Sequence, residues 1–166
     1  MHTNPTIDIE SPDVDFAFDA ARTFVGPHAS YYDETWRQMA WRGRQTSWNR
    51  HAALYGPFWF AYRRLRLVAL ASVLWLLLWL ELWRQGGWSP WLLCGLQLAT
   101  MLFQGLLANR LYLGRFTALG RRLERSLGDA VAREQAMASA GGVSRGGVAA
   151  VILAVALGLG ALELWR

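Results

Sequence analysis

Three long apolar segments dominate the pattern of hydrophobic and polar positions, at about residues 65–83, 88–108 and 148–165. The first contains only two charged residues, Arg66 near its start and Glu81 near its end. A helix rises about 1.5 Å per residue, so about 19 residues reach roughly 28 Å, close to the thickness of a bilayer's hydrocarbon core. The pattern therefore predicts an all-α integral membrane protein with three transmembrane helices.

A polar region follows the second apolar segment, between residues 110 and 139. Its apolar side chains recur every three or four residues, while arginines occupy the other faces; the apolar positions are Phe116, Leu119, Leu123, Leu127 and Val131. This spacing is typical of an amphipathic helix, and we expect the helix to lie on the cytoplasmic surface of the membrane.

Short helices are expected before the first apolar segment. Ser30 is placed to cap a helix that ends at Gly43, with Asp33 three residues after the cap. Ser47 is then placed to cap a second helix, Trp48 to Tyr55. Gly56-Pro57 closes that helix, and Pro57 suits the first turn of the next one, which we expect to run from Phe58 through Arg64 into the first span.

The N-terminal residues 1–28 are predicted to form a disordered acidic arm, and residues 29–166 a single membrane domain. The arm carries five acidic residues against Arg22; they are Asp8, Glu10, Asp13, Asp15 and Asp19. High charge and few apolar residues favour a solvated tail. The alternative is that the apolar patch between Phe16 and Val25 folds back onto another part of the chain.

The distribution of arginine predicts the orientation in the membrane. Residues 36–66 contain seven arginines and no acidic residue, and residues 109–147 contain seven arginines and three acidic residues. The turn between the first two spans offers only Arg84, and the C-terminus only Arg166. Because positively charged loops stay cytoplasmic, we expect the N-terminus inside and the C-terminus outside.

Composition argues against several kinds of site. The single cysteine, Cys94, lies in the second span, which excludes an intramolecular disulfide and a metal site built on cysteines. The three histidines lie far apart and outside the spans, which argues against a haem held inside the membrane. His51 lies close to Asn49, but no nucleophile or carboxylate at a defined spacing completes a catalytic site. We therefore predict no cofactor and no enzymatic activity.

Several short motifs together resemble a known family. In order they are Phe24-Val25-Gly26, Tyr31-Tyr32, Ser47-Trp48-Asn49, Pro57-Phe58-Trp59 with Tyr62-Arg63-Arg64, Ala108-Asn109-Arg110-Leu111-Tyr112, and Gly141-Gly142-Val143-Ser144. Over roughly residues 24–150 the chain is similar to the bacterial family known as domain of unknown function 2628. The resemblance implies a small multi-spanning protein of the inner membrane. It implies no activity and no catalytic residues.

Aromatic and basic side chains gather where the chain is expected to enter the membrane. The residues expected to contact anionic lipid are Trp59, Tyr62, Arg63, Arg64 and Arg66. Such a mixture can also bind nucleic acid, but its position beside a span favours phospholipid headgroups. We therefore expect membrane lipids as partners and no nucleic acid.

Polar residues near the spans are candidates for structural or interaction roles: Trp48, Asn49, Gln97, Gln104 and Asn109. Gln97 and Gln104 share a helical face with Thr100, and this face should point at protein because unsatisfied amides are costly in lipid. We expect Asn49 to cap the second short helix and to fix its angle to the first span. On this view Asn49→Asp and Asn49→Ser, which keep a capping oxygen, should largely restore what Asn49→Ala loses.

These features favour a non-enzymatic accessory or interaction subunit that contacts anionic lipid and another membrane protein or a second copy of itself. Two other functions stay open. A small transporter or channel component would need an oligomer or host complex, because no ionisable group lies near the centre of a span. A membrane enzyme acting on lipid is the third possibility.

Overall fold

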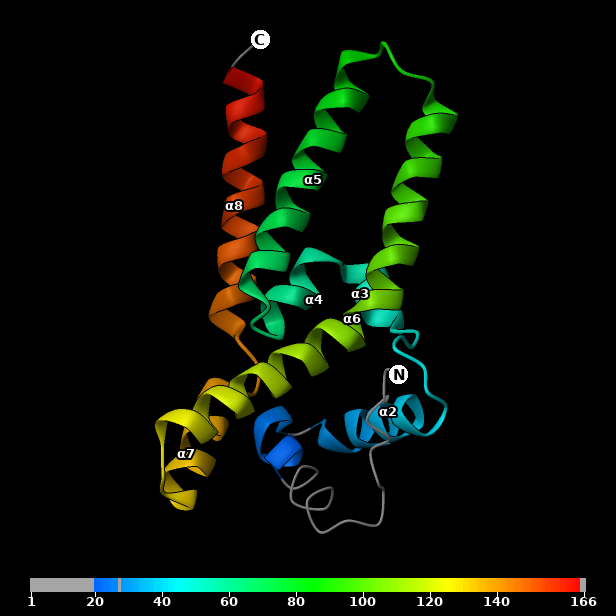
Figure 1. The fold of residues 1–166 in the computed structure, drawn as a ribbon. Coiled ribbons are helices and arrows are strands. Elements are labelled where there is room, and N and C mark those ends of the chain that lie inside the picture. Colours follow the sequence, from blue (N-terminus) through cyan, green and yellow to red (C-terminus); the bar gives the residue numbers. More distant parts are fainter. Residues whose placement is uncertain (1–19, 27, 165–166) are drawn as a thin grey trace. The chain divides into compact units, whose positions relative to one another are not determined.

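The structure, a computed structural model, describes residues 20–26 and 28–164. These residues form helices joined by short connections, and no strand occurs among them, so the predicted all-α class is confirmed. A short helical segment, 20–25, comes first. The labelled helices in Figure 1 are α2 (Ala29–Trp41), α3 (Arg50–Tyr55), α4 (Pro57–Tyr62), α5 (Arg66–Gln85), α6 (Pro90–Ser126), α7 (Ala130–Ala140) and α8 (Arg145–Leu164).

Three helices are long and apolar enough to cross a membrane by length and composition, as predicted. They are α5, the first part of α6, and α8, the apolar helix that ends at Leu164. Gly86 ends α5 in the left-handed conformation, with a φ of 69°, and Pro90 begins α6 after a short turn. Glycine is favoured at such a helix end because it has no Cβ to clash there.

The described residues divide into two compact units, and the single membrane domain over 29–166 stays a prediction. The first unit holds residues 20–45 and 113–142, and the second holds residues 46–112 and 143–164. The polar end of α6 belongs to the first unit and its apolar part to the second.

The first unit is built around a cluster of aromatic rings. The Phe116 ring lies 5.4 Å from the ring of Phe24 and is stacked at 5.6 Å on Trp36, which also meets Tyr32 at 5.5 Å. Phe24, Tyr32 and Trp36 are all buried. Helical structure begins at residue 20, within the arm predicted over 1–28, because the apolar residues Phe24 and Val25 are buried in this core. Residues 1–19 of the arm lie outside the described residues.

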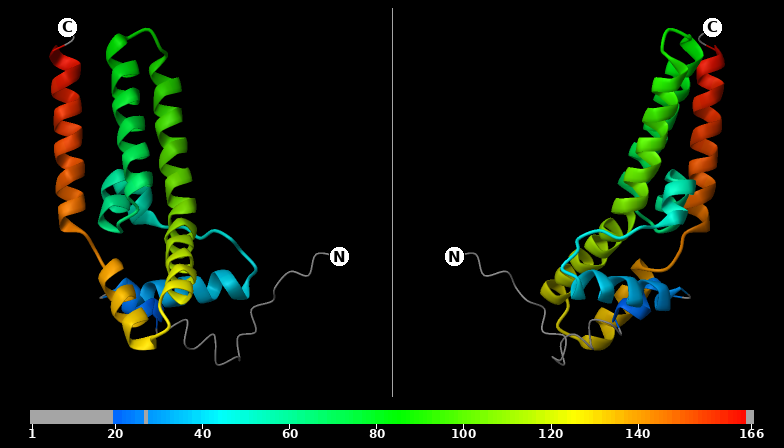
Figure 2. Two further views of the ribbon diagram at one scale, coloured as in Figure 1. Left: turned by 60° about the vertical axis from the view of Figure 1, so that its left-hand side comes forward. Right: turned by 90° about the vertical axis from the view of Figure 1, so that its right-hand side faces the viewer.

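The second unit packs short helices against long ones. Helix α4 contacts α5 and α8, α5 also contacts α8, and α3 contacts α4. In both views of Figure 2, α5, α8 and the apolar part of α6 run side by side. The backbones of α4 and α8 approach closely, since a Cβ at Gly147 would lie 2.8 Å from the carbonyl oxygen of Ala61. The Ser144 N–H donates to the Tyr62 carbonyl at 2.8 Å beside this contact.

The predicted amphipathic helix over 110–139 was wrong in its boundaries. Helix α6 continues without interruption from its apolar part to Ser126, and a separate helix, α7, begins at Ala130. The break falls at Gly128-Asp129, where the Asp129 carboxylate accepts the backbone N–H groups of Val131 and Ala132 at 3.2 and 3.1 Å. This N-cap satisfies donors that would otherwise require the preceding helix to continue.

The predicted continuous helix from Phe58 into the first span was also wrong. Helix α4 ends at Tyr62, and Arg64 adopts a left-handed φ of 59°. The Leu65 N–H then donates to the Phe60 carbonyl at 2.8 Å, and the Arg64 N–H to the Ala61 carbonyl at 3.0 Å. This pair of bonds is a Schellman motif, which normally places glycine where this chain has arginine.

Two predicted caps were wrong as well. Helix α2 begins at Ala29 with His28 in the cap position and no side-chain cap, so Ser30 lies inside the first turn. Asp33 instead pairs with Arg37 at 2.9 Å and with Arg22 at 3.4 Å. Ser47 does not cap α3, because Asn49 occupies the cap position. The predicted end of α2 at Gly43, with its φ of 58°, is confirmed.

Candidate functional site

The start of α3 holds a buried asparagine whose side chain forms hydrogen bonds through both its oxygen and its nitrogen. The Asn49 side-chain oxygen accepts the Ala52 N–H at 3.0 Å, which confirms the predicted helix cap. Its amide nitrogen donates to the Asn109 oxygen on α6 at 2.8 Å, and its backbone N–H donates to the Gly105 carbonyl at 2.9 Å. Asn49 and Asn109 are both buried. Asn49 therefore ties α3 to α6, not to the first span as we expected.

Ser47 completes this chain of hydrogen bonds. The Asn109 amide nitrogen donates to the Ser47 hydroxyl oxygen at 2.8 Å. We call Ser47, Asn49 and Asn109 the amide cluster. Burying an amide costs free energy unless its donors and acceptors are paired. Here each of the two amides accepts one hydrogen bond through its oxygen and donates one through its nitrogen. These hydrogen bonds explain why the three polar residues lie together: they form a structural junction between α3 and α6.

Two glycines allow the backbones to approach around the amide cluster. A Cβ at Gly105 on α6 would lie 2.8 Å from the Trp48 ring and 2.9 Å from the Ala53 methyl group. A Cβ at Gly56, which has a φ of 42°, would lie 2.7 Å from the side-chain oxygen of Gln104. Trp48, named as an interaction residue, is half-exposed and covers Gly105 with one edge of its ring.

A buried arginine lies at the end of α4. Arg63 is only 4% exposed, and its guanidinium carbon lies 5.3 Å from the ring centre of Tyr112 and 5.6 Å from that of Tyr62. Trp59 reaches the same Tyr112 ring edge-on at 6.4 Å. Aromatic faces attract a cation more strongly when water is excluded, so these rings stabilise a positive charge inside the second unit.

The predicted lipid-binding collar does not form one surface. Arg63 and Trp59 are buried, Tyr62 and Arg64 are half-buried, and only Arg66 is exposed. The reason is the left-handed turn at Arg64, which ends α4 and separates its buried residues from the start of α5. Arg63 therefore acts as a core residue, and the exposed Arg66 is the member of the set best placed to meet a phosphate headgroup.

Polar side chains of the spans meet between α5 and α6. Gln104 approaches the Ser72 hydroxyl at 3.5 Å, so one of the two predicted glutamines does face protein. Nearer the other end of these helices, the Trp79 indole N–H donates to the Leu93 carbonyl at 3.0 Å. Between these contacts, the side-chain oxygen of Gln97 and the indole nitrogen of Trp75 are enclosed without a hydrogen-bond partner among the described residues.

No group of three His, Cys, Asp or Glu side chains that could hold a metal occurs in the part of the chain that the structure describes. His51 is exposed, and the Asn49 amide next to it is already bonded to Asn109 and Ala52. The side-chain amide of Asn49 is therefore already occupied by structural hydrogen bonds, which argues against an acid–base pair of Asn49 with His51.

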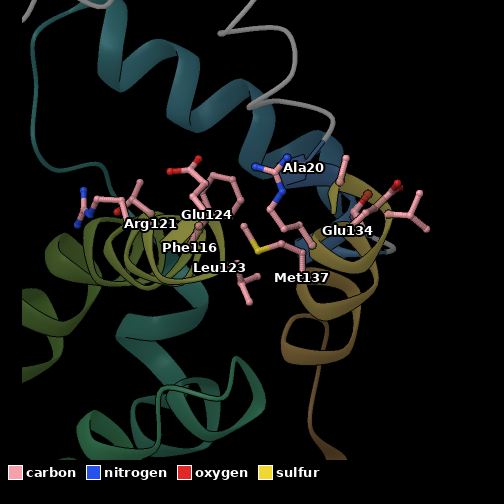
Figure 3. A pocket seen from close by; sticks show the side chains of 13 residues that line it. Ala20, Phe116, Arg121, Leu123, Glu124, Glu134 and Met137 are labelled. Carbon is pink, nitrogen blue, oxygen red and sulfur yellow. The ribbon is translucent and has the colours of Figure 1, made fainter. Parts of the chain in front are cut away.

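A second candidate site is a cavity in the first unit. It has a volume of about 740 Å³ and lies between the segment 20–25, the end of α6 and α7. In Figure 3, Phe116, Leu123 and Met137 form its apolar part, while Arg121, Glu124 and Glu134 stand around it. A pocket of this size and mixed lining suits an amphipathic ligand or a peptide segment.

The family resemblance of the sequence motifs is supported by a family model. Residues 23–117 match the family described as Protein of unknown function (DUF2628), which is more than half of the chain. This protein belongs to DUF2628. No curated protein matches the chain, and no solved structure matches it.

The DUF2628 match includes the whole amide cluster, Gly56, Gly105 and Arg63. It ends at 117, so the Gly141-Gly142-Val143-Ser144 motif and most of the cavity lining lie outside it. Sequence reasoning found Asn49 and Asn109 separately but did not pair them, because 60 residues separate them in the chain. It missed the cavity, since its residues come from segments far apart in sequence.

Proposed function

We propose that this DUF2628 protein is a multi-pass membrane protein that acts as a non-enzymatic interaction subunit, in contact with anionic lipid and with another membrane protein. The observation that carries the proposal is the apolar outer surface of the three long helices. Exposed large apolar side chains cover α5, the first part of α6, and α8; among them are Leu67, Leu70, Leu74, Leu78, Leu92, Leu96, Leu102, Phe103, Ile152, Leu153 and Leu157.

Such a surface favours lipid over water. Soluble monomers rarely expose a contiguous apolar patch larger than a few hundred Å². Burying each leucine in hydrocarbon is favourable by about 1.5–3 kcal/mol, and the helical backbone leaves few unsatisfied polar groups to oppose insertion. The same faces can pack against the helices of a partner, because lipid tails and leucine side chains are equally apolar.

The proposed location is the bacterial inner membrane, with the N-terminus in the cytoplasm and the C-terminus outside. The support is the excess of arginine in residues 36–66 and 109–147 over the two arginines on the other side. With this orientation the first unit lies in the cytoplasm. Its cavity is then the surface best suited to a soluble segment of a partner.

The topology can be tested with single cysteines. Cys94→Ala removes the native thiol, and Gly87→Cys and Ala138→Cys then place one thiol at each predicted side. Both positions are exposed, and Gly87 is a better choice than Gly86, whose left-handed φ would strain a cysteine. In intact spheroplasts an impermeant thiol reagent should label position 87 and spare position 138. The reverse pattern would overturn the orientation.

The interaction role can be tested with two neighbouring positions on α6. Thr117 lines the cavity, whereas Ala118 is exposed and lies outside the lining. After purification in mild detergent, a stoichiometric partner should remain bound to wild type and to Ala118→Arg but be lost from Thr117→Arg. Retention of the partner by both variants would remove the cavity from the proposal.

A component of a transporter or channel is the second candidate function. It is favoured by two enclosed polar atoms in the spans, the side-chain oxygen of Gln97 and the indole nitrogen of Trp75, which have no hydrogen-bond partner among the described residues and could be satisfied by a polar solute. Purified wild-type protein in liposomes should then pass a small polar solute, and Gln97→Leu should not. Liposomes that stay as tight as protein-free controls would remove this candidate.

A further inference from the structure

Helix α8 has two different faces. The face toward the rest of the second unit is buried or half-buried and carries Val148, Val151, Val155, Gly158 and Leu162. The opposite face is exposed and carries a second series, at steps of four and three residues in alternation: Gly146, Ala150, Leu153, Leu157, Gly160 and Leu164. We call this exposed series the open seam. Its mean step of 3.5 residues is the period at which two helices stay in contact along their whole length.

The residues on both sides of the open seam are small. Four exposed alanines flank it: Ala149, Ala154, Ala156 and Ala161. The exposed series on α5 is made of leucines instead: Leu67, Leu70, Leu74 and Leu78. Small residues let the backbones of two membrane helices approach closely, so they are enriched where helices meet. The open seam therefore has the composition of a helix contact, on a face that none of the described helices covers.

The glycines of α8 support the same reading. A Cβ at Gly147 would lie 2.8 Å from the Ala61 carbonyl oxygen, and one at Gly158 would lie 2.5 Å from the Leu77 side chain. Both glycines thus allow a close approach within the chain. At Gly146 and Gly160 a Cβ would meet no described atom within 4 Å. Glycine destabilises a helix interior relative to alanine, and at Gly160 a neighbouring helix from outside this chain would give it the same packing role.

The partner that best matches the open seam is α8 of a second copy. All copies insert with the same orientation, so their α8 helices run parallel and place each seam residue at the same depth. In a parallel pair each layer joins a residue to its own equivalent, so Leu157 meets Leu157 and Gly160 meets Gly160. From 146 to 164 the seam rises roughly 27 Å, which is close to the thickness of the hydrocarbon core.

We propose that this protein forms a homodimer in the membrane, held by the open seams of two parallel α8 helices. Leu153 and Leu157 fill the middle layers, and Gly160 lets the two backbones approach. A pair related by a two-fold axis is the commonest form of oligomer. The inference rests on the proposed function in one respect, that α8 spans a membrane, and it names a second copy as a membrane-protein partner.

Disulfide cross-linking in native membranes tests which face of α8 meets the second copy. Cells make two differently tagged copies of the full chain, both with Cys94→Ala. Leu153→Cys on the open seam is compared with Ile152→Cys beside it, because both positions hold large apolar residues, 59% and 56% exposed. A disulfide requires Cα atoms about 4.4–6.8 Å apart, which only facing positions of a packed pair reach.

Under mild oxidation, Leu153→Cys should form a product that carries both tags at least about fivefold faster than Ile152→Cys. Leu157→Cys should exceed Leu159→Cys in the same way. Equal rates on and off the seam would mean that α8 turns freely in lipid, and would overturn the inference. So would the absence of any product, or a product that joins the seam only to a different protein.

A bulky residue in the seam provides a second measurement. Gly160→Leu is compared with Gly95→Leu on α6, because both glycines are exposed in a span and a Cβ at either meets no described atom within 4 Å. Neither leucine should disturb the packing within one chain. Gly160→Leu should slow cross-linking at Leu153→Cys by about tenfold, since it forces the two helices apart.

The dimer fraction in mild detergent, measured by sedimentation equilibrium, should fall with Gly160→Leu and stay at the wild-type value with Gly95→Leu. Equal effects of the two substitutions, or no effect of Gly160→Leu, would contradict a contact at the open seam.

Failure of this inference and failure of the proposed function give different results. If the protein resists extraction from membranes by alkaline washing and the seam cysteines do not cross-link, only the dimer is wrong. If alkaline washing releases the protein, the proposed membrane location is wrong, and the dimer falls with it. A reversed thiol topology would leave the dimer intact, because both copies would be reversed together.

Discussion

The close approach of α3 to α6 leaves no space for a side chain at Gly105. In Gly105→Ala, the new methyl group would lie 2.8 Å from Trp48 and 2.9 Å from Ala53, well inside van der Waals contact. Trp48 is half-exposed and can turn aside. Ala53 is buried, and the start of its helix is held by the bond from the Asn49 N–H to the Gly105 carbonyl at 2.9 Å.

Two terms of opposite sign decide the size of this effect. Alanine in place of glycine stabilises a helix interior by about 0.5–1 kcal/mol. Overpacking a well-filled contact costs about 1–3 kcal/mol. Gly95 is the matched control, because it lies in the same helix and a Cβ there would meet nothing within 4 Å. Since both variants gain the same helical term, the difference between them isolates the packing cost.

Thermal unfolding in detergent, followed by circular dichroism at 222 nm, measures that difference. A chain of this length shifts its Tm by about 2–4 °C per kcal/mol, so Gly105→Ala should melt about 2–12 °C below Gly95→Ala. Gly95→Ala should melt at or above wild type. Equal Tm values for the two variants would refute the close packing of α3 on α6.

Three further predictions concern single residues of the two units. Asn49→Ala should lower the free energy of unfolding by about 2–4 kcal/mol, since it removes a helix cap and the buried hydrogen bond to the Asn109 side-chain oxygen; Asn49→Asp should not restore it, because a carboxylate cannot donate to that amide oxygen. Arg63→Gln should lower the Tm in detergent, whereas the exposed Arg66→Gln should leave the Tm unchanged and reduce the anionic lipid that copurifies. Gly141→Ala, whose Cβ would lie 2.0 Å from a backbone carbonyl, should cost about 3 kcal/mol or more, while Gly128→Ala should cost little.

Each of these predictions has an outcome that contradicts it. Full stability of Asn49→Ala would show that the amide cluster does not hold α3, and full recovery by Asn49→Asp would support a cap alone. Equal effects of the two arginine substitutions on bound lipid would restore the surface collar. If Gly141→Ala left the protease sensitivity of the first unit unchanged, this would contradict the close approach of the Phe24 backbone to Gly141.

The long helices and one cap could be predicted because their signals are local. Apolar runs of the right length indicate the spans, and an asparagine just before the short Arg50–Tyr55 helix indicates an N-cap. Glycine signals worked where glycine was present, as at Gly43 and Gly56. The turn at Arg64 was missed because arginine occupies a position that glycine normally marks, so the sequence has no local sign that a helix ends there.

The remaining differences come from tertiary packing. Nothing near Arg63 in sequence shows that Tyr112, 49 positions later, covers its charge. The break before α7 does have a local signal, since Gly128-Asp129 joins a helix breaker to a capping residue, but the helical spacing of apolar residues continues across it and hides the break. Helix α6 passes from its apolar to its polar part because Ala108-Asn109-Arg110 contains no residue that stops a helix.

The amide cluster has a consequence for how the protein responds to its surroundings. Its three side-chain bonds join amides, a hydroxyl group and a backbone N–H, and none of these groups gains or loses a proton between about pH 3 and 10. They also carry no net charge that dissolved ions could screen. The junction between α3 and α6 should therefore keep its strength through acid stress and osmotic shock, while raised salt screens the attraction in ion pairs such as Asp33 with Arg37.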